Sequence, residues 1–210
     1  MKFIGKLKMK SRNKIIEFLN TEHVGRIATI DTNGFPQVIP MNFVFANDFI
    51  YMHSHVNGEK LDNIESNSKT GFEVDKELEY LPSYFEDDED ASFADTLYIS
   101  VVIKGLSKII KGRHEKTFAL NSLMNKYQPE GRYKPIEPNM KILDAVKIIR
   151  VNPISMTGKY KIGQNLSDNE KIELAKKILK RNSNTAKETL KIMGITIKDE
   201  ILKITSDSNW

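Results

Sequence analysis

Alternating apolar and polar positions dominate the N-terminal part of the chain. Three segments show the two-residue period of a half-buried strand: residues 24–30, 37–45 and 49–53. Asn33-Gly34 separates the first two and favours a tight hairpin turn, and Asn47-Asp48 marks a second turn. Three short strands joined by tight turns predict a β-meander, and therefore a sheet or barrel core.

Further segments rich in β-branched and apolar residues predict the remaining strands: residues 70–74, 98–110 and 145–151. An acidic stretch, residues 75–90, follows the first of these. We interpret it as a solvated loop, with metal binding as the alternative.

Two prolines, Pro36 just before the predicted strand 37–45 and Pro40 within it, cannot donate ladder hydrogen bonds, which predicts a free edge or a bulge. A flat ligand could use backbone groups left open there. An edge strand with nothing bound is the other interpretation.

Helical spacing of apolar residues predicts helices outside this sheet. They cover residues 11–20 and 114–127, and a short helix passes through Leu61 and Ile64. Together with the strands they predict a mainly β fold, an antiparallel barrel over residues 24–151 with peripheral helices.

The C-terminal part of the chain carries helix-capping signals instead of strand periodicity. Ser167 and Glu170 have the spacing of a capping box, and Thr185 with Glu188 repeats it. Gly194 is placed to end the second helix. We therefore expect a helical tail that forms a small cap or a dimer arm.

Composition narrows the function classes. With 40% hydrophobic and 29% charged residues, the 210-residue chain suits a compact domain with an appendage and argues against disorder. No apolar run reaches the roughly 18 residues of a membrane helix, and early lysines interrupt any signal-peptide core, so we expect a cytoplasmic protein. The absence of cysteine excludes disulfides and thiol catalysis. Because the net charge is +4, a basic β-barrel that binds nucleic acid remains an alternative function.

One dense polar cluster runs from His53 to Lys60, directly after a predicted strand and before a helix. Backbone N–H groups at a helix start, together with the Lys60 ammonium, suit a phosphate. Two alternatives stay open: a polar loop that only caps and hydrogen-bonds, or a metal pair, because alternation puts His53 and His55 on one side. Phosphate-loop, dinucleotide and nucleophile-elbow motifs are absent from the sequence.

Several short sequence motifs follow one another along the chain in a characteristic order and spacing. Between Gly25 and Lys60 they read GRIATID, GFP, VIPMNF, IYMHS and GEK, and SVVIKG, KYQPEG and TGK follow before Lys161. On these motifs the chain resembles the pyridoxamine-phosphate-oxidase-like flavoproteins, and within them the branch of the 5-nitroimidazole resistance proteins. The resemblance implies a split β-barrel homodimer with FMN at the subunit interface.

The resemblance also implies which residues hold FMN. Backbone groups along the flavin ring edge would come from Pro40, Met41 and Asn42. Beside the ribityl chain and phosphate would lie Met52, His53 and Ser54. Lys60 matches the basic residue that pairs with the phosphate, whereas Glu59 stands where oxidases with a Ser-Arg-Lys run have arginine.

The remaining implied contacts lie later in the chain. Ser100 matches a polar ligand on a barrel strand, and three residues would reach the flavin across the dimer: Lys159, Gln164 and Asn165. The resemblance divides the chain into an FMN-binding split-barrel domain, residues 1–161, and a helical extension, residues 162–210, packed on the barrel or on the dimer partner.

The implied function is an FMN-dependent oxidoreductase, pyridoxamine-phosphate-oxidase-like or nitroreductase-like, acting on a small organic substrate. His53 occupies the position of a functional histidine in the nitroimidazole-resistance branch and is the candidate catalytic residue; a structural histidine is the alternative. Two rivals are a non-enzymatic flavin-binding or stress-response protein and a basic nucleic-acid-binding β-barrel. Trp210, the single tryptophan, could stack on a ring. We expect no metal and no membrane partner.

Overall fold

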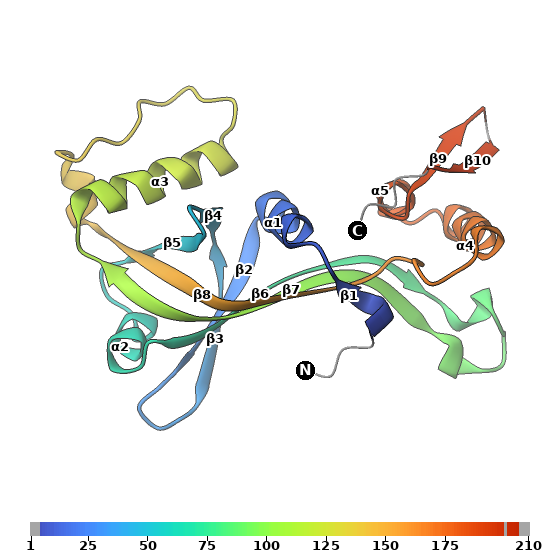
Figure 1. Ribbon diagram of the computed structural model, residues 1–210, viewed down its shortest axis with the longest axis horizontal. Coiled ribbons are helices and arrows are strands. Elements are labelled where there is room, and N and C mark those ends of the chain that lie inside the picture. The colour runs from blue at the N-terminus through green and yellow to red at the C-terminus, as the bar shows by residue number, and fades with distance from the viewer. Residues whose placement is uncertain (1–4, 200, 206–210) are drawn as a thin grey trace. The chain divides into compact units, whose positions relative to one another are not determined.

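The computed structural model describes residues 5–199 and 201–205, which form parts of two compact units (Figure 1). The barrel unit consists of residues 12–74 and 101–157, and the extension unit contains the remaining described residues. Trp210, considered above for ring stacking, lies outside the described residues. Among the residues described, none of the helices is both long and apolar enough to span a membrane.

An eight-stranded sheet is the main element of the chain, in the order β3-β2-β6-β7-β8-β5-β4, with β1 paired to β8. Its strands are β1 Lys8–Met9, β2 Val24–Ile30, β3 Pro36–Asn42, β4 Val44–Ala46, β5 Phe49–His55, β6 Lys69–Leu81, β7 Asp95–Ile110 and β8 Val146–Lys161. In the barrel unit β3, at one end of this order, also contacts β5 near the other end, so the sheet curls back on itself. The predicted antiparallel split barrel is confirmed.

The two predicted hairpin turns are present in the barrel unit. Gly34 has φ +88°, and the Asp31 carboxylate accepts backbone N–H groups of Asn33 and Phe35, each at 2.8 Å. Asn47 and Asp48 both adopt positive φ, 50° and 65°, which suits the tight turn between β4 and β5. Local turn chemistry therefore sets where these strands reverse.

Strand β3 lies at the edge of the sheet. It pairs with β2 through seven consecutive residues, from Val24 opposite Asn42 to Ile30 opposite Pro36. Within the described residues its other edge has no strand partner, so the free-edge interpretation of the two prolines is confirmed. The predicted strand over residues 37–45 is divided at Phe43 into β3 and β4.

Three helices cover the barrel unit: α1 Arg12–Thr21, α2 Glu59–Ser66 and α3 Arg113–Tyr127. Helix α3 contacts β4 and β5 (Figure 1). Its Ala119 and Leu123 pack with the strand residues Val44, Tyr51 and Ile148 in one buried cluster. The helices predicted over residues 11–20 and 114–127 are therefore present. The first begins one residue later than predicted, and the second begins one residue earlier.

The acidic stretch is more ordered than the sequence interpretation allowed. Strand β6 continues to Leu81, and short 3₁₀ helices follow at Ser83–Phe85 and Ala91–Phe93. The expected loop is correct only around residues 86–90, which are exposed. The error arose because Leu78 and Glu79 are both buried, so the two-residue period is broken by an acidic side chain that faces inward.

Glu79 anchors the C-terminal helices within the extension unit. These are α4 Asp168–Arg181 and α5 Ala186–Ile192. The Glu79 side chain is almost fully buried, and its carboxylate accepts from Arg181 at 3.0 Å, Ser183 at 2.5 Å and Thr185 at 2.8 Å. One buried carboxylate therefore accepts hydrogen bonds from the end of α4 and from the loop that joins α4 to α5.

The same contact explains why one predicted cap is wrong. The Ser167–Glu170 capping box of α4 is present, with both reciprocal bonds. At α5, however, Thr185 makes no capping bond to the helix, because its hydroxyl donates to Glu79 instead. Gly194, with φ +77°, follows the end of α5 as expected.

The sequence predicted a purely helical tail, and this prediction is wrong. Its described residues also include a two-stranded antiparallel pair, β9 Ile195–Lys198 and β10 Ile201–Ile204. Each strand has only four residues, too few for a periodic pattern to stand out.

Strand β8 is also longer than predicted, because it continues past Pro153. Its pairing with β5 ends at Val151 opposite Ile50, so the proline lies beyond that ladder and leaves no β5 acceptor unpaired.

Gly25 provides a test of the barrel packing. A Cβ at Gly25 would lie 2.2 Å from Cζ of the buried Phe72 ring. Gly25→Ala should overpack this contact and lower stability by about 1–3 kcal/mol, a melting-point loss of about 2–12 °C. Gly5→Ala, whose Cβ would meet nothing within 4 Å, is the control and should leave the melting point nearly unchanged. Equal losses in both variants would contradict the packing explanation.

The buried Glu79 carboxylate gives a second prediction. Glu79→Gln should cost about 3 kcal/mol, because Arg181 loses its charge partner and two hydroxyls lose an ionic acceptor. Hydrogen exchange should show the loss as faster exchange in α4 and α5, with α3 unaffected. In the control, Glu188→Gln, the half-exposed ion pair with Lys76 at 2.5 Å is lost and exchange should change little.

Candidate functional site

The end of β5 exposes an open backbone edge. Strand β5 pairs with β8 from Ile50 to His55, but β4 covers only Phe49 to Tyr51 on the other side. In the part of the chain that the structure describes, residues 52–55 therefore have no strand partner on the β4 side. Strand β3 contacts β5, so two open edges approach one another in the barrel unit.

Side chains along this edge alternate between the interior and the surface. Met52 and Ser54 are buried, whereas His53 and His55 are exposed on the opposite face. Met52 is fully buried, so only its backbone is available to a ligand. His53 and His55 share a side, as the alternation predicted.

Ser54 has an unsatisfied hydroxyl. Its Oγ is buried and has no hydrogen-bond partner among the described residues. A buried polar group without a partner costs about 1–3 kcal/mol, so a polar group supplied from outside the described residues would relieve this cost. Ser54 is one of the residues that the resemblance assigns to FMN.

The N-terminus of α2 lies immediately after this strand. Gly58 caps the helix with φ 155°, and no side chain bonds to the first turn from this cap. The Lys60 ammonium nitrogen lies 3.4 Å from the position that a Cβ on Gly58 would take. A cation and the N-terminal turn of a helix are thus next to each other, an arrangement that attracts phosphate.

The two histidines differ in their contacts. His55 Nδ1 accepts the Asn57 N–H at 3.2 Å, which holds the loop before α2. Within the described residues, the His53 ring has no hydrogen bond or ion pair, and the side chain is exposed. His53 is therefore available to a ligand, while His55 supports the loop.

The other predicted residues of the barrel unit follow β3. Pro40 and Asn42 are exposed, and Met41 between them is half-buried. In the ladder with β2, Pro40 lies opposite Arg26, Met41 opposite Gly25 and Asn42 opposite Val24. All three lie on the edge strand. Their free backbone edge agrees with the role that the resemblance gives them.

The position of this edge is held by Phe43, the residue between β3 and β4. Tyr127 accepts the Phe43 N–H at 2.9 Å, and its hydroxyl lies within hydrogen-bond distance of the carbonyl oxygens of Phe43 and His23. Lys126 lies 3.8 Å above the Phe43 ring centroid and donates to the Leu19 carbonyl at 2.9 Å. Sequence reasoning placed Tyr127 on a helix but missed this role, since no local pattern links residues so far apart in sequence.

Four predicted residues belong to the extension unit. Ser100 and Lys159 are half-buried, and the Lys159 ammonium lies 5.2 Å from the Tyr98 ring centroid. Gln164 bonds to its own unit: its amide nitrogen donates to the carbonyls of Lys6 and Tyr160, and its oxygen accepts the Ile162 N–H. Asn165 is exposed. Their assignment to the cofactor stays a prediction.

No group of three or more His, Cys, Asp or Glu side chains within the described residues is arranged to hold a metal ion.

The curled antiparallel sheet places this protein in the split-barrel class, a fold in which flavin binding is typical. The chain belongs to the pyridoxamine 5'-phosphate oxidase family, whose model matches residues 11–160. Among proteins with curated descriptions, none matches this sequence significantly.

Solved structures show the same fold at low identity. A candidate 5-nitroimidazole antibiotic resistance protein from Bacteroides thetaiotaomicron is 22% identical, with 73% of this chain and 86% of that chain aligned and a TM-score of 0.61. The flavocytochrome Anf3 from Azotobacter vinelandii is 18% identical over 81% of this chain and 77% of that chain, TM-score 0.66. An FAD and heme binding protein from Mycobacterium smegmatis is 17% identical over 80% and 79%, TM-score 0.63.

Lys126 gives a prediction about pH. Burial lowers the pKa of Lys126 from its usual 10.5 to about 8. Between pH 8 and 10.5 the unfolded chain therefore binds more protons at this site than the folded one, so stability rises with pH in that window. The free energy of unfolding of wild type minus that of Lys126→Met should increase from pH 8 to pH 10. A difference that stays constant in urea unfolding at each pH would contradict the lowered pKa.

Proposed function

We propose that this protein is an FMN-dependent oxidoreductase that acts on a small organic substrate. The observation that carries the proposal is the buried, unpartnered Ser54 hydroxyl at an open strand edge, followed within six residues by the Lys60 ammonium beside the α2 N-terminus. The family includes flavin-dependent oxidoreductases, which supports the same conclusion.

The residues present fit a phosphorylated flavin. Lys60 and the first-turn N–H groups of α2 would bind the phosphate, and Ser54 would donate a hydrogen bond to the phosphate or ribityl chain. Glu59 is exposed and replaces the arginine of other oxidases, so Lys60 is the cation for the phosphate here. Backbone groups of residues 40–42 on the β3 edge would border the ring.

When bound, a flavin supplies the electron or hydride transfer, and the protein supplies binding, orientation and electrostatics. His53 is exposed and without internal partners among the described residues. It is suited to hold the substrate or to donate a proton to it. We assign it the substrate-facing role.

A second copy of this chain is the expected partner. Strand β3 and its turn expose Phe35, 70% accessible, and Val38, 58% accessible, beside the proposed ring-binding edge. Large exposed apolar side chains of this kind suit an interface between subunits. We therefore propose a homodimer in which the partner covers the flavin.

The direct test is the absorbance spectrum of the purified protein, with the released cofactor identified. Stripped protein titrated with FMN, FAD and riboflavin should bind FMN most tightly, because Lys60 and the α2 N-terminus suit one terminal phosphate. Turnover of a nitro compound or an amine by the loaded protein supports an enzyme. FMN binding without any turnover supports a flavin carrier. A colourless protein that binds DNA but no flavin would overturn the proposal.

Lys60 gives the quantitative prediction. Lys60→Ala should weaken FMN binding about 10- to 150-fold, the loss of one charge-assisted contact of about 1.5–3 kcal/mol. Riboflavin, which has no phosphate, should bind nearly as well as to wild type. The control Lys69→Ala removes an exposed lysine from the start of β6 and should change neither ligand. Equal losses for FMN and riboflavin would mean that Lys60 supports the fold instead of the phosphate.

A further inference from the structure

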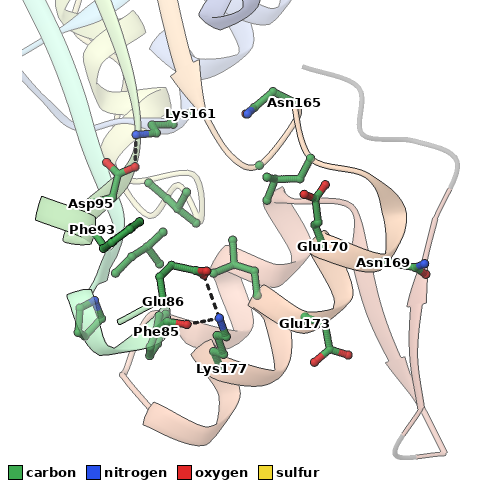
Figure 2. A pocket seen from close by; sticks show the side chains of 16 residues that line it. Phe85, Glu86, Phe93, Asp95, Lys161, Asn165, Asn169, Glu170, Glu173 and Lys177 are labelled. Carbon is green, nitrogen blue, oxygen red and sulfur yellow. Dashed lines mark hydrogen bonds and ion pairs between the residues drawn. The ribbon is translucent and has the colours of Figure 1, made fainter. Parts of the chain in front are cut away.

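A cavity of about 480 Å³ lies within the extension unit, between α4 and the segment that joins β6 to β7. Figure 2 shows the pocket with α4 on one side and the Phe93 and Asp95 segment on the other. Its walls are largely apolar, formed by Leu81, Phe85, Phe93, Leu97, Leu166 and Leu174. The volume is typical of sites for small organic molecules, about 300–1,000 Å³.

Both lysines that line the cavity are neutralised by the protein itself. Lys161 pairs with Asp95. Lys177 donates to the Phe85 carbonyl and pairs with Glu86 at 2.9 Å. Both pairs are drawn in Figure 2. Neither lysine is left over to attract an anionic ligand.

The carboxylates that line the cavity are not all paired with a cation of the protein. Glu173 pairs with Lys176 at 2.6 Å. Glu170, however, accepts only the Ser167 N–H and hydroxyl, each at 2.7 Å, and pairs with no cation among the described residues. These bonds lower the pKa of Glu170, so its side chain is ionised at neutral pH. In Figure 2 Glu170 and Asn165 lie at one end of the pocket and the Lys177–Glu86 pair at the other.

We propose that this cavity binds a small organic cation, an amine on an aromatic or branched alkyl body. The apolar walls would take the body, and Glu170 would pair with the ammonium. Apart from Asn165, this site uses none of the residues assigned to the flavin. The inference therefore goes beyond the proposed function, and either can fail without the other.

The test uses a matched pair of probes on the full-length protein. Dansylcadaverine carries an aromatic body with a primary ammonium, and dansyl-6-aminohexanoic acid carries the same body with a carboxylate. Isothermal titration calorimetry should show one cation site per chain, with the carboxylate probe at least about tenfold weaker. Saturating FMN should leave the affinity for dansylcadaverine unchanged.

Two variants locate the site. Glu170→Gln removes the charge and keeps a side chain that serves in a capping box, so the helix start should survive. It should weaken dansylcadaverine about two- to fivefold, because Glu170 is an exposed side chain and an exposed ion pair contributes little. The control Asp168→Asn makes the same charge change in the same helical turn, at a residue that does not line the cavity, and should have no effect. Leu174→Trp should fill the cavity and abolish binding, with circular dichroism and the melting curve used to verify folding.

Three outcomes would overturn the proposal. Equal affinity for the two probes would remove the charge selection. Equal weakening by Glu170→Gln and Asp168→Asn would reduce the effect to net charge. Displacement of dansylcadaverine by FMN would assign the cavity to the flavin instead. Should Leu174→Trp fail to fold, the comparison of the two charge variants still decides.

Discussion

The hydrogen bonds between the Tyr127 phenol and the Phe43 peptide are the constraint on which the barrel unit depends. Phe43 is the point where edge strand β3 gives way to β4, and its N–H is taken by a hydroxyl from the end of α3. Burial raises the pKa of Tyr127, so the phenol stays protonated and able to donate over the physiological range. Lys126 lies 3.8 Å above the Phe43 ring centroid. The open edge at residues 40–42 is held next to β5 by this junction.

The extension unit shows a similar use of one polar group to set a backbone corner. Glu79 is buried on β6 and receives three side-chain donors from the segment between α4 and α5. The Thr189 hydroxyl adds a bond to the neighbouring Leu78 carbonyl at 2.8 Å. A buried carboxylate is tolerated only when it is fully paired, so these helices and this strand require one another. The same arrangement holds α4 in place as one wall of the cavity.

The fold and the site carry different kinds of information about function. Structures less than 25% identical share the fold, which shows that many sequences support this barrel. The proposed chemistry would depend on a few groups that are placed on it: an unsatisfied Ser54 hydroxyl, a lysine at a helix start and an exposed His53. These groups lie within one strand–loop–helix segment, so a local sequence pattern was enough to propose them as a site. Tyr127 and Glu79 act through distant contacts, and the sequence did not assign them these roles.

Local signals in the sequence determined the strands, turns and caps whose causes are local. Asn33-Gly34 reverses the chain because glycine adopts positive φ, and the Ser167–Glu170 box starts α4 through bonds within one turn. Tertiary structure decided the rest. The acidic stretch became strand because Glu79 found partners about 100 residues away, and Thr185 gave up its capping role to the same carboxylate. Some polar side chains can hydrogen-bond either within their own turn or to a distant residue. Which bond forms depends on the partner that is buried next to the side chain, and burial is a property of the folded chain as a whole.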